Sequence, residues 1–453
     1  MPFRWDPKAE IAPPSKQQSG ADDGASHALS TGPGKALWKK LKQHPMAAIG
    51  PGLITGVADD DPSGIATYSQ AGAQFGLNML WTMPLSFPMM AAIQSLCALI
   101  GRVTGKGLAA NIKLSFPPYV LKVVVLLLLI ANTLNIAADI AAMGEVAELV
   151  TSIDRHAMTV FFVILTLALQ IVVPYHRYVL YLKWLTLSLL AYAAVLFTVH
   201  VPWRDVAWRT LWPHVVPSRM TATMITGVFG TTISPYLFFW QASEEIEDMR
   251  LKGDAKPLVQ DAASGPSELM RIRWDTWSGM FYSNIAAYFI ILATAVTLHV
   301  AGITDITTAA QAASALRPLA GDLAYLLFAL GILGVGLIGV PVLAGSASYA
   351  LCEAMNWQWG LERKAKDARG FYGVIATSVL AALIIQYSPM PPMKALFWSA
   401  VINGVVAVPL MVVILLLVSR KSVMGDFLAP KFVVYIGWIA ALVMGIAMVG
   451  MFL

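Results

Sequence analysis

The chain has 453 residues, of which 57% are hydrophobic and 13% carry a formal charge, against roughly 25% charged residues in an ordinary soluble domain. Together with a mean hydropathy of +0.66, this composition excludes a cytosolic globular protein. Unbroken apolar blocks such as 405–418 also exclude a membrane β-barrel, whose strands alternate apolar and polar residues. The net charge is +5. In a membrane protein an excess of Lys and Arg mainly reflects its orientation in the bilayer, so no nucleic-acid partner is expected.

The N-terminal segment, residues 1–45, is predicted to be a disordered cytoplasmic tail. It is polar and rich in Pro, Ser, Gly and Asp up to about residue 34, and it lacks the apolar core of a signal peptide. Residues 46–453 form the predicted transmembrane domain. The two cysteines, Cys97 and Cys352, lie in apolar runs without the spacing of a disulfide framework or a zinc site, and we expect them to be packing residues.

Apolar blocks bounded by charges, Gly or Pro predict eleven membrane-spanning helices, because about 20 apolar residues are needed for each. If the N-terminus is cytoplasmic, 25 of the 31 Lys and Arg residues fall on the cytoplasmic side. This distribution predicts a multi-pass protein of the cell membrane with its C-terminus outside. The predicted spans are 47–75, 77–100, 119–150, 157–174, 178–200, 222–248, 276–301, 322–350, 370–388, 395–419 and 432–453.

The first and sixth spans are interrupted by Pro beside small polar residues, in 59-DDDPSGIAT-67 and 230-GTTISPYLF-238. The interruptions lie five spans apart, and two consecutive five-helix repeats must have opposite orientations. Paired breaks of this kind mark the central site of inverted-repeat transporters. The predicted fold is all-α, with a first repeat at 46–200, an inverted second repeat at 220–419 and an extra helix at 432–453.

The breaks predict a cation site. Proline frees backbone carbonyls that need a partner at membrane depth, and Asp61 directly precedes Pro62. The alternative places 59–61 in a surface loop, but the flanking segments are apolar enough to be half-helices. Oxygen ligands favour Mg²⁺, Ca²⁺ or Mn²⁺ over copper or zinc. The predicted metal-binding residues are Asp61, Ala58, Gly64, Thr231 and Ser234, although each hydroxyl taken alone is better explained by a bond to its own helix.

Further residues are predicted to line the pathway or to support the site. Asp139, in the third span, either faces a cavity or pairs structurally with a neighbouring helix. The acidic group at Glu244 and Glu245 is most simply a solvated helix end, with an acidic exit vestibule as the alternative. The remaining candidates are Asp59, Asp60, Thr232, Tyr236 and Asn403.

At these residues the sequence resembles the Nramp family of divalent-metal transporters, from about Gly50 to the C-terminus. The resemblance implies a LeuT-like fold and makes Asp61 of the Asp-Pro pair a metal ligand. The chain departs from the family pattern at three positions, with Gly64 for Asn, Ser234 for Met and Tyr236 for His. These departures resemble the Nramp-related magnesium transporter branch, which implies transport of Mg²⁺ and Mn²⁺.

Loss of the thioether makes the site harder, and Gly64 is expected to enlarge it, so we predict a largely hydrated ion. Tyr236 does not titrate near neutral pH as His does, and Ala142 stands where relatives usually carry a second acid. We therefore predict uniport without proton coupling. A potential of 100 mV supplies a divalent cation with about 4.6 kcal/mol, which is enough for accumulation.

Four alternatives remain. The first is a proton-coupled Mn²⁺ or Fe²⁺ importer of the main Nramp type. A sodium-coupled carrier of organic solutes is disfavoured because 59-DDDP-62 would repel a substrate carboxylate. A channel is disfavoured by the paired breaks, and an enzyme by the absence of catalytic motifs from the sequence. No cofactor beyond the transported ion is predicted, and the oligomeric state is left open, with a monomer as the working assumption.

Overall fold

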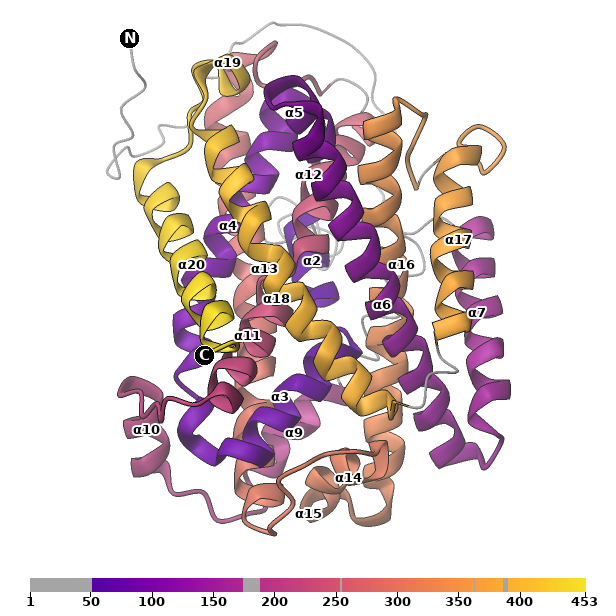
Figure 1. The fold of residues 1–453 in the computed structure, drawn as a ribbon, viewed down its shortest axis with the longest axis vertical. Coiled ribbons are helices and arrows are strands. Elements are labelled where there is room, and N and C mark those ends of the chain that lie inside the picture. Colours follow the sequence, from indigo (N-terminus) through magenta and orange to yellow (C-terminus); the bar gives the residue numbers. More distant parts are fainter. Residues whose placement is uncertain (1–50, 174–187, 253–254, 362, 386–389) are drawn as a thin grey trace, which may run out of the picture. The chain divides into compact units, whose positions relative to one another are not determined.

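The computed structural model describes residues 51–173, 188–252, 255–361, 363–385 and 390–453. Within these ranges the chain is built from helices joined by turns and loops, without strands (Figure 1). The predicted tail and part of the predicted fifth span, 178–187, lie outside the described residues. Residues 50–453 form one compact unit.

Eight helical segments of the described part are long and apolar enough to cross a membrane. A shorter apolar helix, α17, and the broken helix α2–α3 match two further predicted spans. The helices are α2 (Pro51–Asp59), α3 (Pro62–Phe75), α4 (Thr82–Thr104), α5 (Leu108–Ser115), α6 (Pro118–Thr151), α7 (Arg155–Val172), α9 (Leu190–Val195), α10 (Trp203–Leu211), α11 (Arg219–Thr232), α12 (Pro235–Leu251), α13 (Gly265–Thr294), α14 (Ala309–Ala313), α15 (Arg317–Ala320), α16 (Ala324–Met355), α17 (Arg369–Ile385), α18 (Pro392–Val418), α19 (Lys421–Met424) and α20 (Lys431–Gly450). A π-helical turn, Ala295–His299, continues α13, and short 3₁₀ turns lie at Gly76–Met79, Ala262–Ser264, Ser314–Leu316 and Gly321–Leu323.

Both predicted helix breaks are confirmed. The first ends α2 at Asp59 and starts α3 at Pro62, and the second ends α11 at Thr232 and starts α12 at Pro235. Proline fits the first turn of a helix, where its missing N–H has no partner to lose, so each Pro opens a new half-helix. The half-helices then pair, because α2 packs against α12 and α3 packs against α11.

The half-helix α2 lies very close to α13. A Cβ on Gly56 would come within 2.3 Å of the Gly279 carbonyl oxygen, so only glycine allows this approach. Helix α13 begins at Gly265, eleven residues before the predicted start at 276. The added turns contain Glu268 and Arg271, whose charges broke the apolar pattern in the sequence but are paired with each other in the fold.

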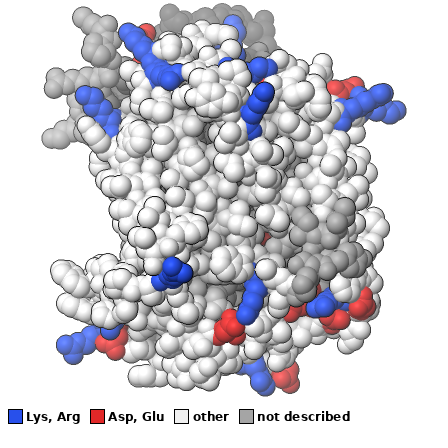
Figure 2. Space-filling view, viewed as in Figure 1, with Lys and Arg blue, Asp and Glu red and all other residues white. Residues whose placement is uncertain are grey.

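Charged side chains lie near the two ends of the visible face, while the band between them is almost free of charge (Figure 2). Many large apolar side chains are exposed, among them Phe197 on one connection and Leu442 and Ile446 on α20. An uncharged band with outward-facing apolar side chains matches the hydrocarbon layer of a bilayer. The described chain is therefore a multi-pass membrane protein.

Candidate functional site

Asp61 lies at the first helix break and is 1% exposed. It is the N-cap of α3, and its Oδ1 accepts hydrogen bonds from the Gly64 backbone N–H at 2.9 Å and from the Ser63 hydroxyl at 2.6 Å. The surface-loop alternative for residues 59–61 is wrong, since all three aspartates are buried. Because Asp61 caps α3 through Oδ1, its second oxygen, Oδ2, can interact with partners from other helices.

The second break reaches this oxygen through Tyr236, on the first turn of α12. The Tyr236 hydroxyl lies 3.3 Å from Asp61 Oδ2 and 3.2 Å from the carbonyl oxygen of Ala58. Its single proton can serve only one of these acceptors at a time. The structure thus brings together Ala58, Asp61 and Tyr236, one from each side of the first break and one from the second.

Two residues that the sequence analysis did not single out complete this group. Asn135 of α6 donates from Nδ2 to Asp61 Oδ2 at 2.8 Å, and its Oδ1 accepts from the Ser399 hydroxyl of α18 at 2.5 Å. Asn135 lies one turn before the predicted Asp139 on the same helix, and this spacing was the available sequence signal.

The space beside Gly64 is closed rather than open. A Cβ at this position would lie 3.1 Å from Thr231 Oγ1 and 3.3 Å from Tyr68 Cε2. The predicted enlargement at Gly64 is therefore wrong in this conformation, because Tyr68 and Thr231 fill the space. The Thr231 side chain is buried there and interacts with Tyr68.

Ser234 and Thr232 follow the simpler explanation given for hydroxyls in helices. Ser234 Oγ donates to the carbonyl oxygens of Thr231 at 2.7 Å and Gly230 at 3.0 Å. Thr232 Oγ1 donates to the carbonyl oxygen of Val228 at 3.0 Å. Both side chains are buried at the second break. In this conformation their hydroxyls satisfy their own helix, so their role as ligands stays a prediction.

Asp59 and Asp60 face a different helix from Asp61. The Ser283 hydroxyl of α13 lies 2.5 Å from Asp59 Oδ2 and 3.0 Å from Asp60 Oδ1. The other oxygen of each carboxyl is buried without a hydrogen-bond partner among the described residues. The three consecutive aspartates thus divide between α13 on one side and α6 and α12 on the other.

Asp139 and Asn403 are both fully buried. Asp139 interacts electrostatically with Asp61, and neither of its oxygens makes a hydrogen bond of acceptable geometry within the described chain. The same holds for both amide atoms of Asn403, which follows Ser399 by one turn on α18. Since residues four apart share a helix face, Asn403 lies on the side of α18 that faces the site.

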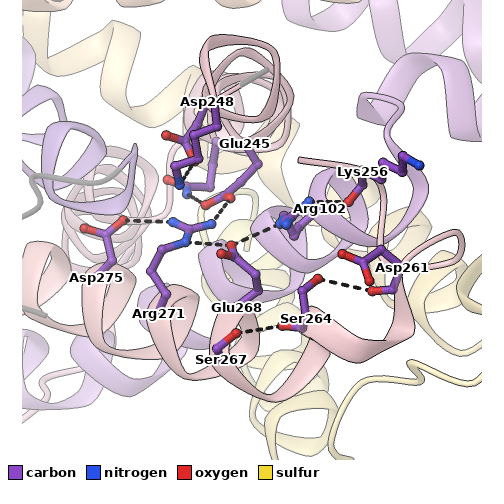
Figure 3. A network of polar contacts seen from close by, with 12 residues as sticks. Arg102, Glu245, Asp248, Lys256, Asp261, Ser264, Ser267, Glu268, Arg271 and Asp275 are labelled. Atoms are coloured by element: carbon purple, nitrogen blue, oxygen red, sulfur yellow. Dashed lines mark hydrogen bonds and ion pairs between the residues drawn. The ribbon is translucent and has the colours of Figure 1, made fainter. Parts of the chain in front are cut away.

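The acidic group after the second break is not a solvated helix end, and that simpler prediction is wrong. Glu245 is fully buried and pairs with Arg271 of α13, which also contacts Glu268 at 2.9 Å. Glu268 in turn pairs with Arg102 of α4 at 3.0 Å (Figure 3). Glu244 is half-buried and accepts a hydrogen bond of 3.4 Å from the Tyr349 hydroxyl.

This charged network also holds α2 in place. Asp275, close to Arg271 in Figure 3, accepts a hydrogen bond of 2.7 Å from the Gly52 backbone N–H at the start of α2. One turn further along, Thr55 of α2 donates to Gln241 of α12 at 2.5 Å. The half-helix before Asp61 is therefore fixed to both α12 and α13.

A cavity of about 780 Å³ opens between α6, α7, α14 and α18. Its lining includes Ser399, which connects through Asn135 to Asp61, and also Glu145, Arg155 and His156. The cavity thus comes within two hydrogen bonds of the buried carboxylate.

The described residues hold no cluster of three or more His, Cys, Asp or Glu side chains that could bind a metal. The groups that reach Asp61 Oδ2 from other helices are instead neutral, the Tyr236 hydroxyl and the Asn135 NH₂ group, and the Ala58 carbonyl oxygen lies within hydrogen-bond reach of the same hydroxyl. A cation held here would have one carboxylate and weak neutral ligands, which is the ligand chemistry of Mg²⁺ or Mn²⁺ rather than of copper or zinc.

Two broken helices that meet at a buried carboxylate, within a bundle of membrane-spanning helices, define a polytopic protein of the inverted-repeat class. The family model described as "Natural resistance-associated macrophage protein-like" (Nramp) matches residues 52–453. The chain belongs to the Nramp family.

Curated relatives include the divalent metal cation transporter MntH of Klebsiella pneumoniae (strain ATCC 700721 / MGH 78578), which is 26% identical over 404 residues and matched over 87% of this chain and 90% of the relative. The MntH protein of Acidiphilium cryptum is also 26% identical, over 81% of this chain and 84% of the relative. These relatives are named as transporters, in agreement with the prediction that the chain is not an enzyme.

Among solved structures, a manganese transporter of Eremococcus coleocola superposes with a TM-score of 0.68 at 16% identity, covering 93% of this chain and 88% of that one. Mhp1, a nucleobase-cation-symport-1 family transporter, gives a TM-score of 0.52 at 14% identity, covering 88% and 92%. At these identities the likeness shows the fold alone. It confirms the predicted fold class.

Proposed function

We propose that this chain is a secondary transporter that carries divalent cations across the cell membrane by alternating access, with Asp61 as the central ligand. The observation that carries the proposal is the meeting of both helix breaks at the Tyr236 hydroxyl, which lies within hydrogen-bond reach of Asp61 Oδ2 and of the Ala58 carbonyl oxygen. The MntH relatives are named as divalent metal cation transporters, which supports the same substrate class.

Manganese is the ion that the comparisons favour, through the name of the Eremococcus coleocola transporter. Acceptance of Mg²⁺ is a separate proposal that rests on the ligands of this chain. The described surroundings of Asp61 Oδ2 are oxygen and amide groups without a thioether or imidazole, and such hard ligands suit Mg²⁺ as well as Mn²⁺.

Two modes of energy coupling are open to this site. Uniport is supported by Tyr236 and Ala142, which stand where the family resemblance implies titratable groups. A proton-coupled importer of Mn²⁺ or Fe²⁺ is supported by Asp139, a buried carboxyl close to Asp61 that can carry a proton. The Eremococcus coleocola protein gives the precedent for the ion of this second mode, since it is named as a manganese transporter.

Uptake of Mn²⁺ into proteoliposomes at an inside-negative potential tests these proposals. We expect uptake by the unsubstituted chain and none by Asp61→Ala, with both proteins monodisperse after extraction. Full uptake by Asp61→Ala would refute the site. Competition by millimolar Mg²⁺ supports magnesium as a substrate, and acidification of the lumen during metal entry supports proton coupling against uniport.

The orientation and domain boundaries also stay proposals. We propose a cytoplasmic N-terminus, an external C-terminus and a repeat division at 46–200 and 220–419, followed by the extra helix 432–453. The Lys and Arg distribution supports this orientation. Protease accessibility of tags placed at each terminus in sealed, right-side-out vesicles tests it, since only the C-terminal tag is expected to be cleaved.

A further inference from the structure

The Asn135 amide holds a central position between the site and α18. Asn135 is fully buried, with Nδ2 at 2.8 Å from Asp61 Oδ2 and Oδ1 at 2.5 Å from Ser399 Oγ. In this arrangement the amide donates to the carboxylate. A cation bound at Asp61 Oδ2 would face the positive end of that NH₂ group, so the loaded site cannot keep this orientation.

Ser399 can satisfy the amide in either orientation. Its hydroxyl has one proton and two lone pairs, and it has a second acceptor, the Leu396 carbonyl oxygen, at 2.7 Å. When the proton points to Asn135 Oδ1, the amide offers its NH₂ group to Asp61. When the proton points to Leu396, Ser399 Oγ can accept from Asn135 Nδ2, and the amide oxygen then faces Asp61.

The distances fit a shared cation. After a half-turn about the Cβ–Cγ bond, Oδ1 takes the place of Nδ2, which lies 2.8 Å from Asp61 Oδ2. Small divalent ions such as Mg²⁺ bind oxygens at about 2.1 Å in octahedral geometry, so that neighbouring ligands are about 3.0 Å apart. The pair of Asp61 Oδ2 and the turned Asn135 oxygen therefore matches one edge of such an octahedron.

We propose that Asn135 is a ligand of the transported cation, that its amide turns by half a rotation when the cation binds, and that Ser399 stabilises both orientations. The inference rests on the proposed function of Asp61. It also gives the site a neutral amide oxygen, which Gly64 does not supply.

Titration of Mn²⁺ into the purified full-length chain by calorimetry tests the proposal. Asn135→Ala removes the oxygen and is expected to weaken Mn²⁺ binding at least tenfold. Asn135→Asp keeps an oxygen but removes the NH₂ donor, and is expected to bind at least as tightly as the unsubstituted chain. Asn132→Ala is the matched control, because this buried amide of α6 donates to Leu343 and Ser346 of α16 instead.

The outcomes separate a ligand from a residue that only positions Asp61. If Asn135→Asp is as weak as Asn135→Ala, the amide acts only as a donor and the proposal fails. It also fails if Asn135→Ala binds Mn²⁺ normally. If Asp61→Ala retains normal binding, the proposed function fails instead.

A structure of the unsubstituted chain with Mn²⁺ bound is a second test that needs no variant and is therefore independent of variant folding. A metal at about 2.0–2.2 Å from Asn135 Oδ1, the range for small octahedral cations, is the expected result. A metal on Asp61 with the Asn135 NH₂ group still facing the carboxylate would overturn the proposal while leaving the proposed function intact. Ser399→Ala adds a weaker effect, a several-fold loss of Mn²⁺ affinity, because the turned NH₂ group then lacks its acceptor.

Discussion

Gly339 of α16 is the residue whose substitution tests the position of Asp61 most directly. A Cβ added at Gly339 would lie 3.1 Å from Asp61 Cβ and 3.8 Å from Asp61 Cα. Carbon atoms in good contact are about 3.5–4.0 Å apart. In Gly339→Ala, Asp61 and α16 must therefore separate by about 0.4–0.9 Å, and the carboxylate moves relative to the Ala58 carbonyl and the Asn135 amide.

This displacement sets the expected loss of Mn²⁺ affinity in Gly339→Ala. Adding a methyl group to a packed interior destabilises it by about 1–3 kcal/mol. If that strain falls on the cation-loaded site, Mn²⁺ binding weakens by roughly 5-fold to 140-fold, at about 1.4 kcal/mol per factor of ten. Calorimetric titration of Mn²⁺ into the purified variant measures the change, and its thermal unfolding reports whether the fold is intact.

Gly373→Ala on α17 is the control, because a Cβ there meets nothing within 4 Å. This variant is expected to bind Mn²⁺ as the unsubstituted chain does. Normal Mn²⁺ affinity in a folded Gly339→Ala protein would refute the argument, since it would mean that the cation does not depend on where Asp61 is held.

Two further substitutions probe the surroundings of the site. Arg271→Gln leaves the buried Glu245 carboxylate without its guanidinium partner and is expected to destabilise the protein by about 3–5 kcal/mol. Thermal unfolding measures this loss. The reasoning is contradicted if the double variant Arg271→Gln/Glu245→Gln does not regain stability. Tyr236→Phe removes a hydroxyl that competes with a cation for Asp61 Oδ2. Cation binding then no longer has to break a hydrogen bond with a net value of about 0.5–1.5 kcal/mol, so Mn²⁺ should bind roughly 2- to 12-fold more tightly, whereas weaker binding would identify the hydroxyl as a ligand.

The helix breaks and Asp61 could be predicted from the sequence, because proline and neighbouring small polar residues interrupt a helix within a few residues of their own position. Asn135 and Ser399 are different. They are separated from Asp61 by 74 and 338 positions in the sequence, and only the packing of α6 and α18 brings them to one carboxylate. The apolar pattern of the helix does not distinguish Asn135 from Asn132, which faces α16, and only the one-turn spacing from Asp139 favours Asn135.

The charged helix ends were misjudged for a related reason. A run such as 244-EEIED-248 is usually solvated, and its sequence does not contain the partner that changes this. Arg271 lies in turns that the apolar pattern assigned to a connection, so the pairing with Glu245 could not be anticipated. The space at Gly64 was misjudged because removal of a side chain says nothing of which neighbours, here Tyr68 and Thr231, move into its place.

Hydrogen bonds between helices define two groups around the first break. Helix α2 is tied to α13 through Ser283 and through the hydrogen bond from Gly52 to Asp275, and to α12 through Gln241. Helices α6 and α18 are joined to each other by Asn135 and Ser399. The hydrogen bond from Asn135 to Asp61 crosses between these groups. A displacement of one group against the other therefore acts directly on the cation site, and a cation that replaces this hydrogen bond with two metal–oxygen contacts would change how strongly the groups are held together.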